Sequence, residues 1–180
     1  MTQNRTLSLI LPAFGAAIIA ALAQIVIPIG AVPITLQTFA VGLVAAILKP
    51  REATLAATLY LILGAIGLPV FAGGGGGGLQ AFFGPSAGYL LAYPFFALVT
   101  SALAHAKTPI WKIFLAFVLG DALVFVGGIL SLHFLGKMGW SAAVAVGLTP
   151  FIIPDLLKGL IVALVTKPVL KALKNHSYFN

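Results

Sequence analysis

The stretch WKIFLAFVLGDALVFVGGILSLHFL, residues 111–135, decides what kind of fold this chain can adopt. Its only charged residues, counting Lys, Arg, Asp and Glu, are Lys112 at its beginning and Asp121 near its middle. A helix of about 20 mostly apolar residues crosses the hydrocarbon core of a bilayer, so this stretch is long enough to span a membrane. The whole chain has the same character, with 61% hydrophobic and 7% charged residues. Such a composition cannot present a mainly polar surface to water, which predicts an integral membrane protein.

Apolar runs of this kind predict an all-α membrane protein, in which residues 1–180 form one domain and a single bundle of six transmembrane helices. The runs occupy roughly residues 7–29, 33–48, 53–67, 86–105, 111–135 and 150–172. The second and third are short, so interfacial ends or a re-entrant piece are open alternatives for them. The segment 139–149 is too short to cross. A cleaved signal peptide is not expected, because the first run has a weakly basic start and further spans follow it.

Basic residues predict the orientation of the bundle, because cytoplasmic loops accumulate lysine and arginine. Eight of the ten fall before the first run, in alternate loops and at the end of the chain: Arg5, Lys49, Arg51, Lys107, Lys112, Lys167, Lys171 and Lys174. The opposite loops contain only Lys137. We therefore expect a multi-pass protein of the cell membrane with both termini in the cytoplasm. The net charge of +7 is explained by this topology, and no nucleic-acid partner is expected.

A run of six glycines lies in the loop expected outside, between the third and fourth spans: Gly73, Gly74, Gly75, Gly76, Gly77 and Gly78. A phosphate-binding loop of the Walker type requires a lysine after its glycines, and Leu79 and Gln80 follow here. A flexible connection is one alternative, because glycine restricts the backbone least. The other is a gating loop, whose apolar flanks fold over a pocket and become ordered on binding. Apolar residues at 68–71 and 82–83 favour the gating loop.

Asp155 and Lys158 are ionisable residues within the last apolar run, where charge is costly and indicates function. Their spacing of three places both on one helical face, and Pro154 puts Asp155 close to a helix start, where the helix dipole is positive. In the structural alternative, Lys158 extends to the outer interface and Asp155 caps the helix. In the functional alternative, the Lys158 ammonium binds the carboxylate of an anionic ligand, while Asp155 orients it or binds another polar group.

The other two acids are less informative. Glu52 adjoins Lys49 and Arg51, which indicates a solvated partner in a cytoplasmic loop. Asp121 has no charged partner one helical turn away. It could cap a cavity, form an interhelical hydrogen bond or titrate in proton coupling, and the sequence does not choose among these roles.

Further polar side chains gather where spans are expected to meet the outer surface. With Lys158 they would line one outward-facing cavity: Thr35, Gln37, Thr38, Gln80, Ser86 and Tyr89. The three histidines lack a metal-ligand spacing, cysteine is absent, and no nucleophile has an adjacent base. Neither a metal nor enzymatic activity is therefore expected.

Small residues form a stripe on the first expected helix, at Ala13, Ala17 and Ala21, with Ala16 and Ala20 alongside. A spacing of four residues makes a flat surface that another helix can approach closely. Packing within the protein and docking of another membrane protein are both consistent with this stripe.

Four segments resemble, in order, the biotin-specific substrate-binding subunits of energy-coupling-factor transporters, the BioY family: PITLQTFAVGL (33–43), YLILGAIGLPVFAGG (60–74), GPSAGYL (84–90) and PDLLKG (154–159). The resemblance covers most of the chain. It implies a six-helix bundle that binds the vitamin from outside and works with a transmembrane coupling protein and two ATPase subunits. It also implies that Asp155 and Lys158, which match the family's D-x-x-K pattern, contact biotin, and that the alanine stripe faces the coupling protein.

The resemblance agrees with the anionic-ligand site that the residues predict, and it implies a high-affinity biotin-binding membrane subunit that has no cofactor and is not an enzyme. Biotin has a carboxylate for Lys158, a ureido ring that needs donors and acceptors, and an apolar portion suited to Phe71, Phe82 and Phe83. No ATP-binding motif was found, so energy is expected from separate subunits. Two alternatives are a proton-coupled secondary transporter of a small carboxylate-bearing vitamin and a membrane scaffold.

Overall fold

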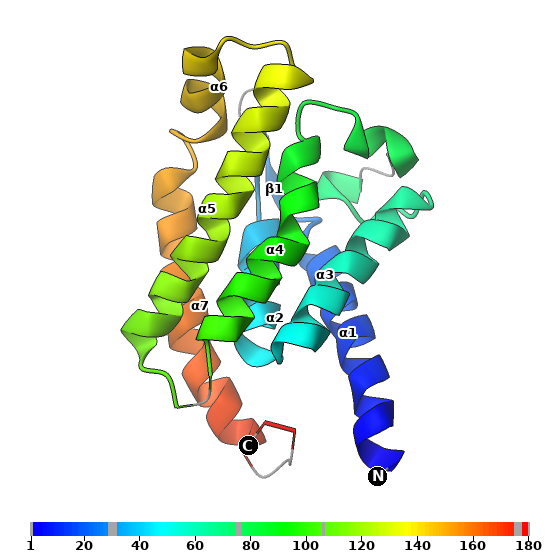
Figure 1. Ribbon diagram of the computed structural model, residues 1–180, viewed down its shortest axis with the longest axis vertical. Helices are drawn as coiled ribbons and strands as arrows, with labels where there is room; N and C mark the ends of the chain where they lie inside the picture. The colour runs from blue at the N-terminus through cyan, green and yellow to red at the C-terminus, as the bar shows by residue number, and fades with distance from the viewer. Residues whose placement is uncertain (1, 29–31, 75–76, 106, 175–177, 180) are drawn as a thin grey trace.

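The protein is mostly helical in a computed structural model that describes residues 2–28, 32–74, 77–105, 107–174 and 178–179, without the side chains of residues 2–6 (Figure 1). Its helices are α1 (Thr2–Leu22), α2 (Gln37–Ile47), α3 (Pro50–Ala65), α4 (Ala87–Leu103), α5 (Ile110–Phe134), α6 (Trp140–Gly147) and α7 (Ile152–Leu173). Two short 3-10 helices, η1 (Ala72–Gly74) and η2 (Gly78–Phe82), lie between α3 and α4. The expectation of a helical fold is therefore confirmed in outline.

A two-stranded antiparallel sheet was not expected from the sequence. Strands β1 (Val26–Ile27) and β2 (Ile34–Thr35) pair with Val26 opposite Thr35, where the first and second apolar runs had been expected to be helical. The helical prediction was wrong for the last residues of the first run and for the first residues of the second, because α1 ends at Leu22 and α2 begins at Gln37. Pro28 and Pro33 explain part of this difference, because proline lacks the N–H that a helix interior requires.

Helix length distinguishes α5 from its neighbours. Among the described helices, α5 alone is long and apolar enough to cross a bilayer unaided, and α6 with α7 meets that requirement as a pair bent by 43°. The apolar helices α2 and α4, and the apolar part of α1 (Leu7–Leu22), are shorter. α2, for example, has 11 residues and extends about 16 Å at 1.5 Å per residue. Helix length by itself therefore does not establish the six spans expected from hydropathy.

The helices pack through small residues that let their backbones approach. A Cβ added to Gly88 of α4 would lie 1.8 Å from the Gly127 carbonyl oxygen of α5. A Cβ added to Gly15 of α1 would lie 2.8 Å from the Ala56 Cβ of α3. Contacts of this kind are typical of helices packed in lipid, where van der Waals contact replaces the hydrophobic effect between helices.

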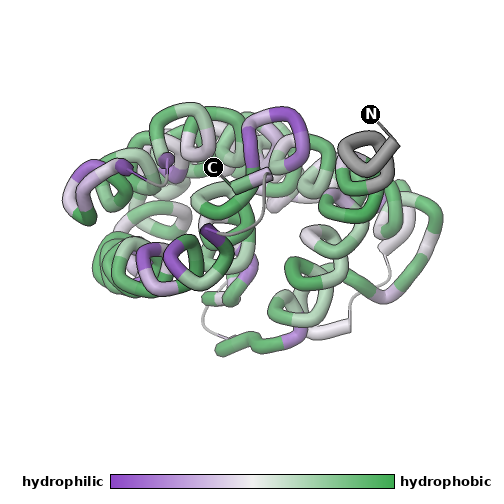
Figure 2. Tube along the Cα trace, turned by 90° about the horizontal axis from the view of Figure 1, so that it is seen from below, coloured by the Kyte–Doolittle hydropathy of each residue, from purple (hydrophilic) through white to green (hydrophobic). Residues whose placement is uncertain are grey.

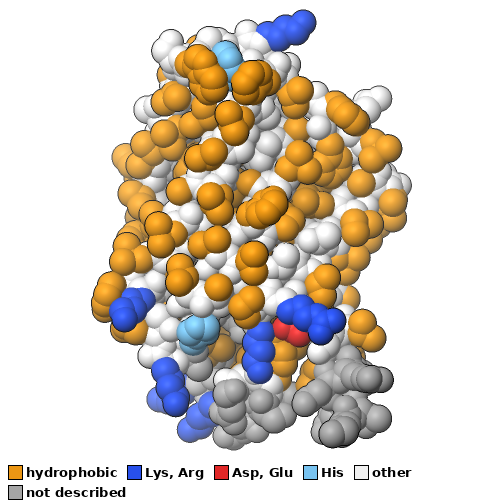
Figure 3. Space-filling view, in the orientation of Figure 1, with side chains coloured by type: hydrophobic (Ala, Val, Ile, Leu, Met, Phe, Trp, Pro, Cys, Tyr) orange, Lys and Arg blue, Asp and Glu red, His pale blue; other side chains and the backbone are white. Residues whose placement is uncertain are grey.

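Large hydrophobic side chains are exposed on most of the helices, and basic side chains gather towards one end of the molecule (Figure 3). Both chain ends lie at the same end of the bundle, and α6 and the segment between α3 and α4 lie towards the other (Figure 1). In the view along the bundle, most positions on the helices are hydrophobic (Figure 2). Exposed hydrophobic side chains cover the face between the two ends, whereas Lys and Arg side chains gather near the chain ends (Figure 3). A helical protein that is hydrophobic outside as well as inside is suited to lipid.

Candidate ligand-binding site

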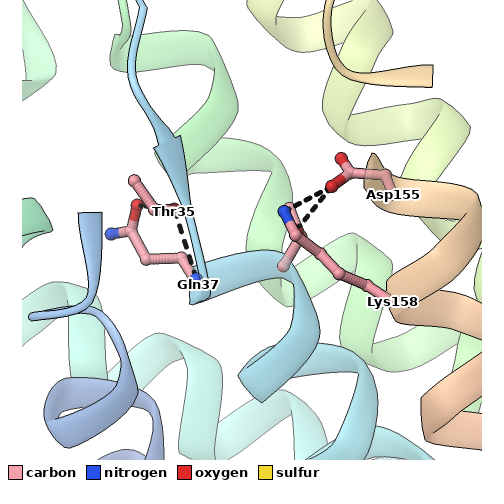
Figure 4. Close-up of polar contacts among 5 residues, drawn as sticks. Thr35, Gln37, Asp155 and Lys158 are labelled. Carbon is pink, nitrogen blue, oxygen red and sulfur yellow. Dashed lines mark hydrogen bonds and ion pairs between the residues drawn. The ribbon is translucent and has the colours of Figure 1, made fainter. Parts of the chain in front are cut away.

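An ion pair and a hydroxyl connect α7 to α2 in the interior (Figure 4). The Lys158 ammonium forms a salt bridge with Asp155 Oδ1 and donates a hydrogen bond to Thr38 Oγ1 at 3.0 Å. Thr38 Oγ1 donates in turn to Asp155 Oδ1 at 3.3 Å, which closes the triangle. The side chains of Lys158 and Asp155 are only 9% and 5% exposed. The alternative in which Lys158 reaches out to the interface is therefore not what the structure shows.

The position of Asp155 in the fold lowers the cost of this buried pair. Asp155 lies in the first turn of α7, where unpaired N–H groups give the helix end a partial positive charge that stabilises a carboxylate. Burying two charges remains expensive even when they are paired, so a buried ion pair is weak evidence for stability alone. Asp155 and Lys158 are therefore candidates for binding a ligand.

A second polar group is fixed at the start of α2. Thr35 Oγ1 donates to Gln37 Oε1 at 3.0 Å, and Gln37 Nε2 donates to the Tyr60 hydroxyl of α3 at 2.6 Å. The Gln37 backbone N–H also donates to Thr35 Oγ1 at 3.2 Å. Both ends of the Gln37 amide are thus held, and Figure 4 shows Thr35 and Gln37 across from Asp155 and Lys158.

A cavity of about 230 Å³ brings these two polar groups together. Eight of the residues that the sequence placed in the site line this cavity: Thr35, Gln37, Thr38, Phe71, Ser86, Tyr89, Asp155 and Lys158. Gln80 lies on the exposed side of η2 and is not part of this lining. Of the glycine run, Gly77 lines the cavity, whereas Gly73, Gly74 and Gly78 do not. Gly75 and Gly76 lie outside the described residues.

Aromatic rings form an apolar wall. Phe71 is buried and meets Tyr60 and Phe82 edge to face, at centroid distances of 5.5 and 5.8 Å. Phe83 was expected to help to hold an apolar ligand, but it is 76% exposed and outside the lining, so that expectation was wrong. Phe82, which was expected to play the same part, also lies outside the lining, and its ring packs against Phe71 instead.

Sequence reasoning missed Tyr93, Val124, Phe125 and Phe151, which also line the cavity. Tyr93 could have been found, since it follows Tyr89 by four residues and so shares its helical face. Tyr89 itself is held firmly: its hydroxyl donates to the Gly147 carbonyl at 2.7 Å, and its ring covers Gly128. The tyrosine thereby connects the cavity to α5 and α6.

Two carboxylates lie outside this lining. Glu52 was expected to be solvated, but it is 6% exposed and accepts a hydrogen bond from the Tyr178 hydroxyl at 3.1 Å. The expectation was wrong because Tyr178, from the far end of the chain, contacts Glu52 in the first turn of α3. Asp121 is buried in α5, and its Oδ1 has no hydrogen-bond partner among the described residues.

The alanine stripe of α1 faces outward. Ala13, Ala17 and Ala21 are exposed, whereas Ala16, beside the stripe, is fully buried. The described side chains therefore leave the stripe uncovered, and the packing within the protein uses Gly15 and Ala16 instead.

These features define a class of protein: a helical membrane protein with a small, partly apolar cavity in which a lysine is held beside a carboxylate. The chain belongs to the BioY family, whose family model matches residues 1–175. It is 42% identical to "Biotin transporter BioY2" of Lactococcus lactis subsp. cremoris (strain MG1363), over 99% of both chains. It is also 36% identical to "Biotin transporter BioY" of Rhizobium etli, over 92% of this chain and 94% of that one.

A solved structure shares the fold. It is described as the crystal structure at 2.1 Å of the S-component for biotin from an ECF-type ABC transporter. The TM-score is 0.88 at 27% sequence identity, and the match covers 100% of this chain and 99% of the other.

Proposed function

We propose that this protein is the membrane-embedded, biotin-binding subunit of a vitamin uptake transporter of the energy-coupling-factor type. The observation that carries the proposal is the buried Lys158 ammonium in the lining of the cavity, in a chain whose relatives are named biotin transporters. Those names do not favour the secondary-transporter and scaffold alternatives, and they describe transport, not an enzyme.

The cavity offers complementary chemistry at its two sides. Lys158 has three N–H donors, of which two are directed at Asp155 and Thr38, so one is available for the biotin carboxylate. Asp155 fixes the ammonium, and the carboxylate completes a charge-assisted bond with it. Thr35, Gln37, Ser86 and Tyr89 supply hydrogen-bonding groups for the ureido ring, while Phe71 contacts the apolar portion.

In the membrane, we place six spans with both termini in the cytoplasm and the glycine run outside. The concentration of basic side chains near the chain ends supports this orientation (Figure 3). Trp111 and Trp140, 59% and 52% exposed, lie just inside the start of α5 and just beyond its end. The 25 residues of α5 extend about 37 Å, so the two tryptophans suit opposite membrane interfaces.

The segment between α3 and α4 acts as a gate over the cavity. Phe71, Ala72, Gly77 and Ala81 belong to this segment and line the cavity, so biotin would contact it directly. A hydrogen bond of 3.2 Å from Gly73 N–H to the Ala23 carbonyl joins the segment to the end of α1. Gly73, Gly74 and Gly78 have φ values of 64°, 77° and 52°, which glycine adopts without the penalty of a side chain.

Transport requires partners: a transmembrane coupling protein and two ATPase subunits. The exposed stripe of Ala13, Ala17 and Ala21 supports α1 as the docking surface for the coupling protein.

Equilibrium binding of labelled biotin to the purified protein tests this function. We expect saturable binding at one site per chain, which is independent of pH near neutrality and is displaced by unlabelled biotin. A short aliphatic carboxylate should not compete, because it lacks the ureido ring. Absence of saturable binding by protein that retains its helical circular dichroism would overturn the proposal.

A further inference from the structure

A second and larger cavity lies at the opposite end of the bundle from the biotin site. Its volume is about 750 Å³, and it opens to the surface. Its lining comes from the connection between α2 and α3, from described residues between α4 and α5, from the end of α7 and from Tyr178 and Phe179. None of the residues assigned to biotin lines it. It therefore needs an explanation of its own.

Charge around this cavity has one sign. Lys49, Lys107 and Lys112 line it, together with His105, and no described lining residue is acidic. All three lysines are exposed, so their ammonium groups can reach a ligand without losing an internal ion pair. α5 also begins here at Ile110, and no side chain caps its first turn. Three ammonium groups beside the positive end of a helix favour an anion.

The remaining walls of the cavity are apolar. Ile47, Leu48, Leu103 and Leu170 belong to the lining, and Leu103 is 48% exposed. Next to Lys112 lies Trp111, whose ring is 5.3 Å from the Lys112 Nζ and which is 59% exposed. Exposed tryptophan beside lysine is typical of the level at which lipid headgroups meet acyl chains. The cavity thus has a basic rim at headgroup level and an apolar wall that continues towards the bilayer.

The C-terminal wall is fixed by a specific set of contacts. The Tyr178 hydroxyl donates to Glu52 Oε2 at 3.1 Å and accepts from the Lys49 backbone N–H at 3.0 Å. The Lys49 ammonium lies 4.8 Å from the centre of the Tyr178 ring. Burial raises the pKa of the Tyr178 hydroxyl, so it stays protonated and keeps donating at neutral pH. Glu52 lies three residues after Lys49 in the chain, and the Tyr178 hydroxyl donates a hydrogen bond to it. The lysines are therefore left to determine the charge that a ligand meets in this cavity.

We propose that this cavity binds the headgroup of an anionic phospholipid, with the phosphate among Lys49, Lys107 and Lys112 and the acyl chains along Leu103. A free anion would use the lysines but not the apolar wall, whereas an amphiphile uses both. Basic pockets between helices on the cytoplasmic side of a membrane are suited to acidic lipid headgroups. The inference relies on the proposed membrane orientation and is independent of biotin.

Lipid binding to the purified full-length chain in detergent tests the site. Dioleoyl-phosphatidylglycerol and dioleoyl-phosphatidylcholine are titrated separately, and bound lipid is counted by native mass spectrometry. The site variant is Lys107→Gln/Lys112→Gln. Its matched control is Lys171→Gln/Lys174→Gln, which removes the same charge from the same end but from exposed residues outside the cavity lining.

We expect the native chain and the control variant to bind one phosphatidylglycerol in preference to phosphatidylcholine. At roughly 1 kcal/mol for each lysine near a lipid headgroup, the site variant should bind phosphatidylglycerol about 30-fold more weakly. Inorganic phosphate at millimolar concentration should not displace the lipid, since it lacks acyl chains. Biotin binding should be the same in all three proteins, which separates failure of this site from failure of the biotin site.

Three results would overturn the lipid site. Equal weakening in the site and control variants would mean that the lipid responds to the general charge of this end. Displacement by inorganic phosphate would indicate an anion site without a lipid. Unchanged lipid binding, combined with loss of co-purification of the coupling protein from the site variant, would assign the lysines to a protein partner.

Discussion

The ring of Phe71 lies directly over Gly64: a Cβ added to Gly64 would be 2.0 Å from Phe71 Cζ. Gly64 belongs to the last turn of α3, and Phe71 follows after the chain has reversed, so the ring is held between α3 and the cavity. Only the absence of a side chain at position 64 lets Phe71 occupy this place. The aromatic wall of the biotin cavity therefore depends on a residue that does not line it.

Gly64→Ala is expected to weaken biotin binding by displacing Phe71. Overpacking of this kind destabilises a fold by about 1–3 kcal/mol, so the melting temperature should fall. We expect about half of this cost to fall on the biotin-bound state alone, where Phe71 must lie against the ligand, which gives roughly a tenfold loss of affinity. Gly139→Ala is the matched control, because a Cβ at Gly139 meets no atom within 4 Å and its φ of −63° suits alanine. Native affinity in Gly64→Ala would show that the Phe71 ring does not contact biotin.

The segment between α3 and α4 should become protected when biotin binds. Amide hydrogen exchange in Phe71–Gly74 and Gly78–Phe82 is expected to slow with ligand, because a closed gate lowers the exposure of these amides. Exchange in α6, which does not line the cavity, serves as the internal reference. Equal exchange with and without biotin would leave this segment as a flexible connection.

The proposed orientation can be tested with single cysteines, since the native chain contains none. Ser86 and Lys107 are both exposed and flank α4 at its two ends. An impermeant thiol reagent applied to intact cells should label Ser86→Cys and not Lys107→Cys. Permeabilised cells should show labelling of both, which controls for reactivity. The reverse pattern in intact cells would place the termini outside.

The sequence predicted the helical class and the close placement of Asp155 and Lys158, because both follow from local patterns. Hydropathy identifies apolar helices, and a spacing of three residues puts two side chains on one helical face. The partner of this pair could not be found in the same way, since Thr38 lies 120 residues from Lys158 in the chain. Burial of Glu52 was missed for the same reason: Tyr178, which covers it, is 126 residues away.

The ends of the helices were also beyond local reasoning. Pro28 and Pro33 interrupt the helices, but hydropathy does not show that β1 and β2 pair between the first two runs, because a short apolar strand and a short apolar helix look alike in sequence. The consequence reaches the site, since Thr35 belongs to β2 and its hydroxyl fixes Gln37 at the start of α2.

Ala17→Leu is expected to prevent docking of the coupling protein and to spare biotin binding. Ala17 is exposed on α1, so leucine fits the isolated chain but would hold an approaching helix away. Ala122→Leu, at an exposed alanine of α5, is the matched control for added bulk. Co-purification of the coupling protein and equilibrium biotin binding are measured for both. An intact complex with weakened biotin binding in Ala17→Leu would contradict the docking role.

Lys158 should decide the preference for a carboxylate. If its ammonium binds the biotin carboxylate in the cavity, removing it leaves that carboxylate unpaired, which costs roughly 2–5 kcal/mol. At about 1.4 kcal/mol for each factor of ten, affinity should fall about 30-fold or more. Lys158→Met keeps the apolar stem, yet it also leaves Asp155 buried without its ion-pair partner. The double variant Asp155→Asn/Lys158→Met removes that charge, so a loss of binding common to both variants is not explained by an unpaired Asp155.

Comparing biotin with a neutral biotin amide isolates the contribution of the carboxylate. The native protein should prefer biotin strongly, because only the acid forms a charge-assisted bond with Lys158. Both variants should lose most of this preference while still binding the amide through Gln37, Tyr89 and Phe71. The preference is a ratio measured on one protein, so partial unfolding cancels from it. A variant that keeps the full native preference would mean that another group recognises the carboxylate, and the assignment of Lys158 would then be wrong.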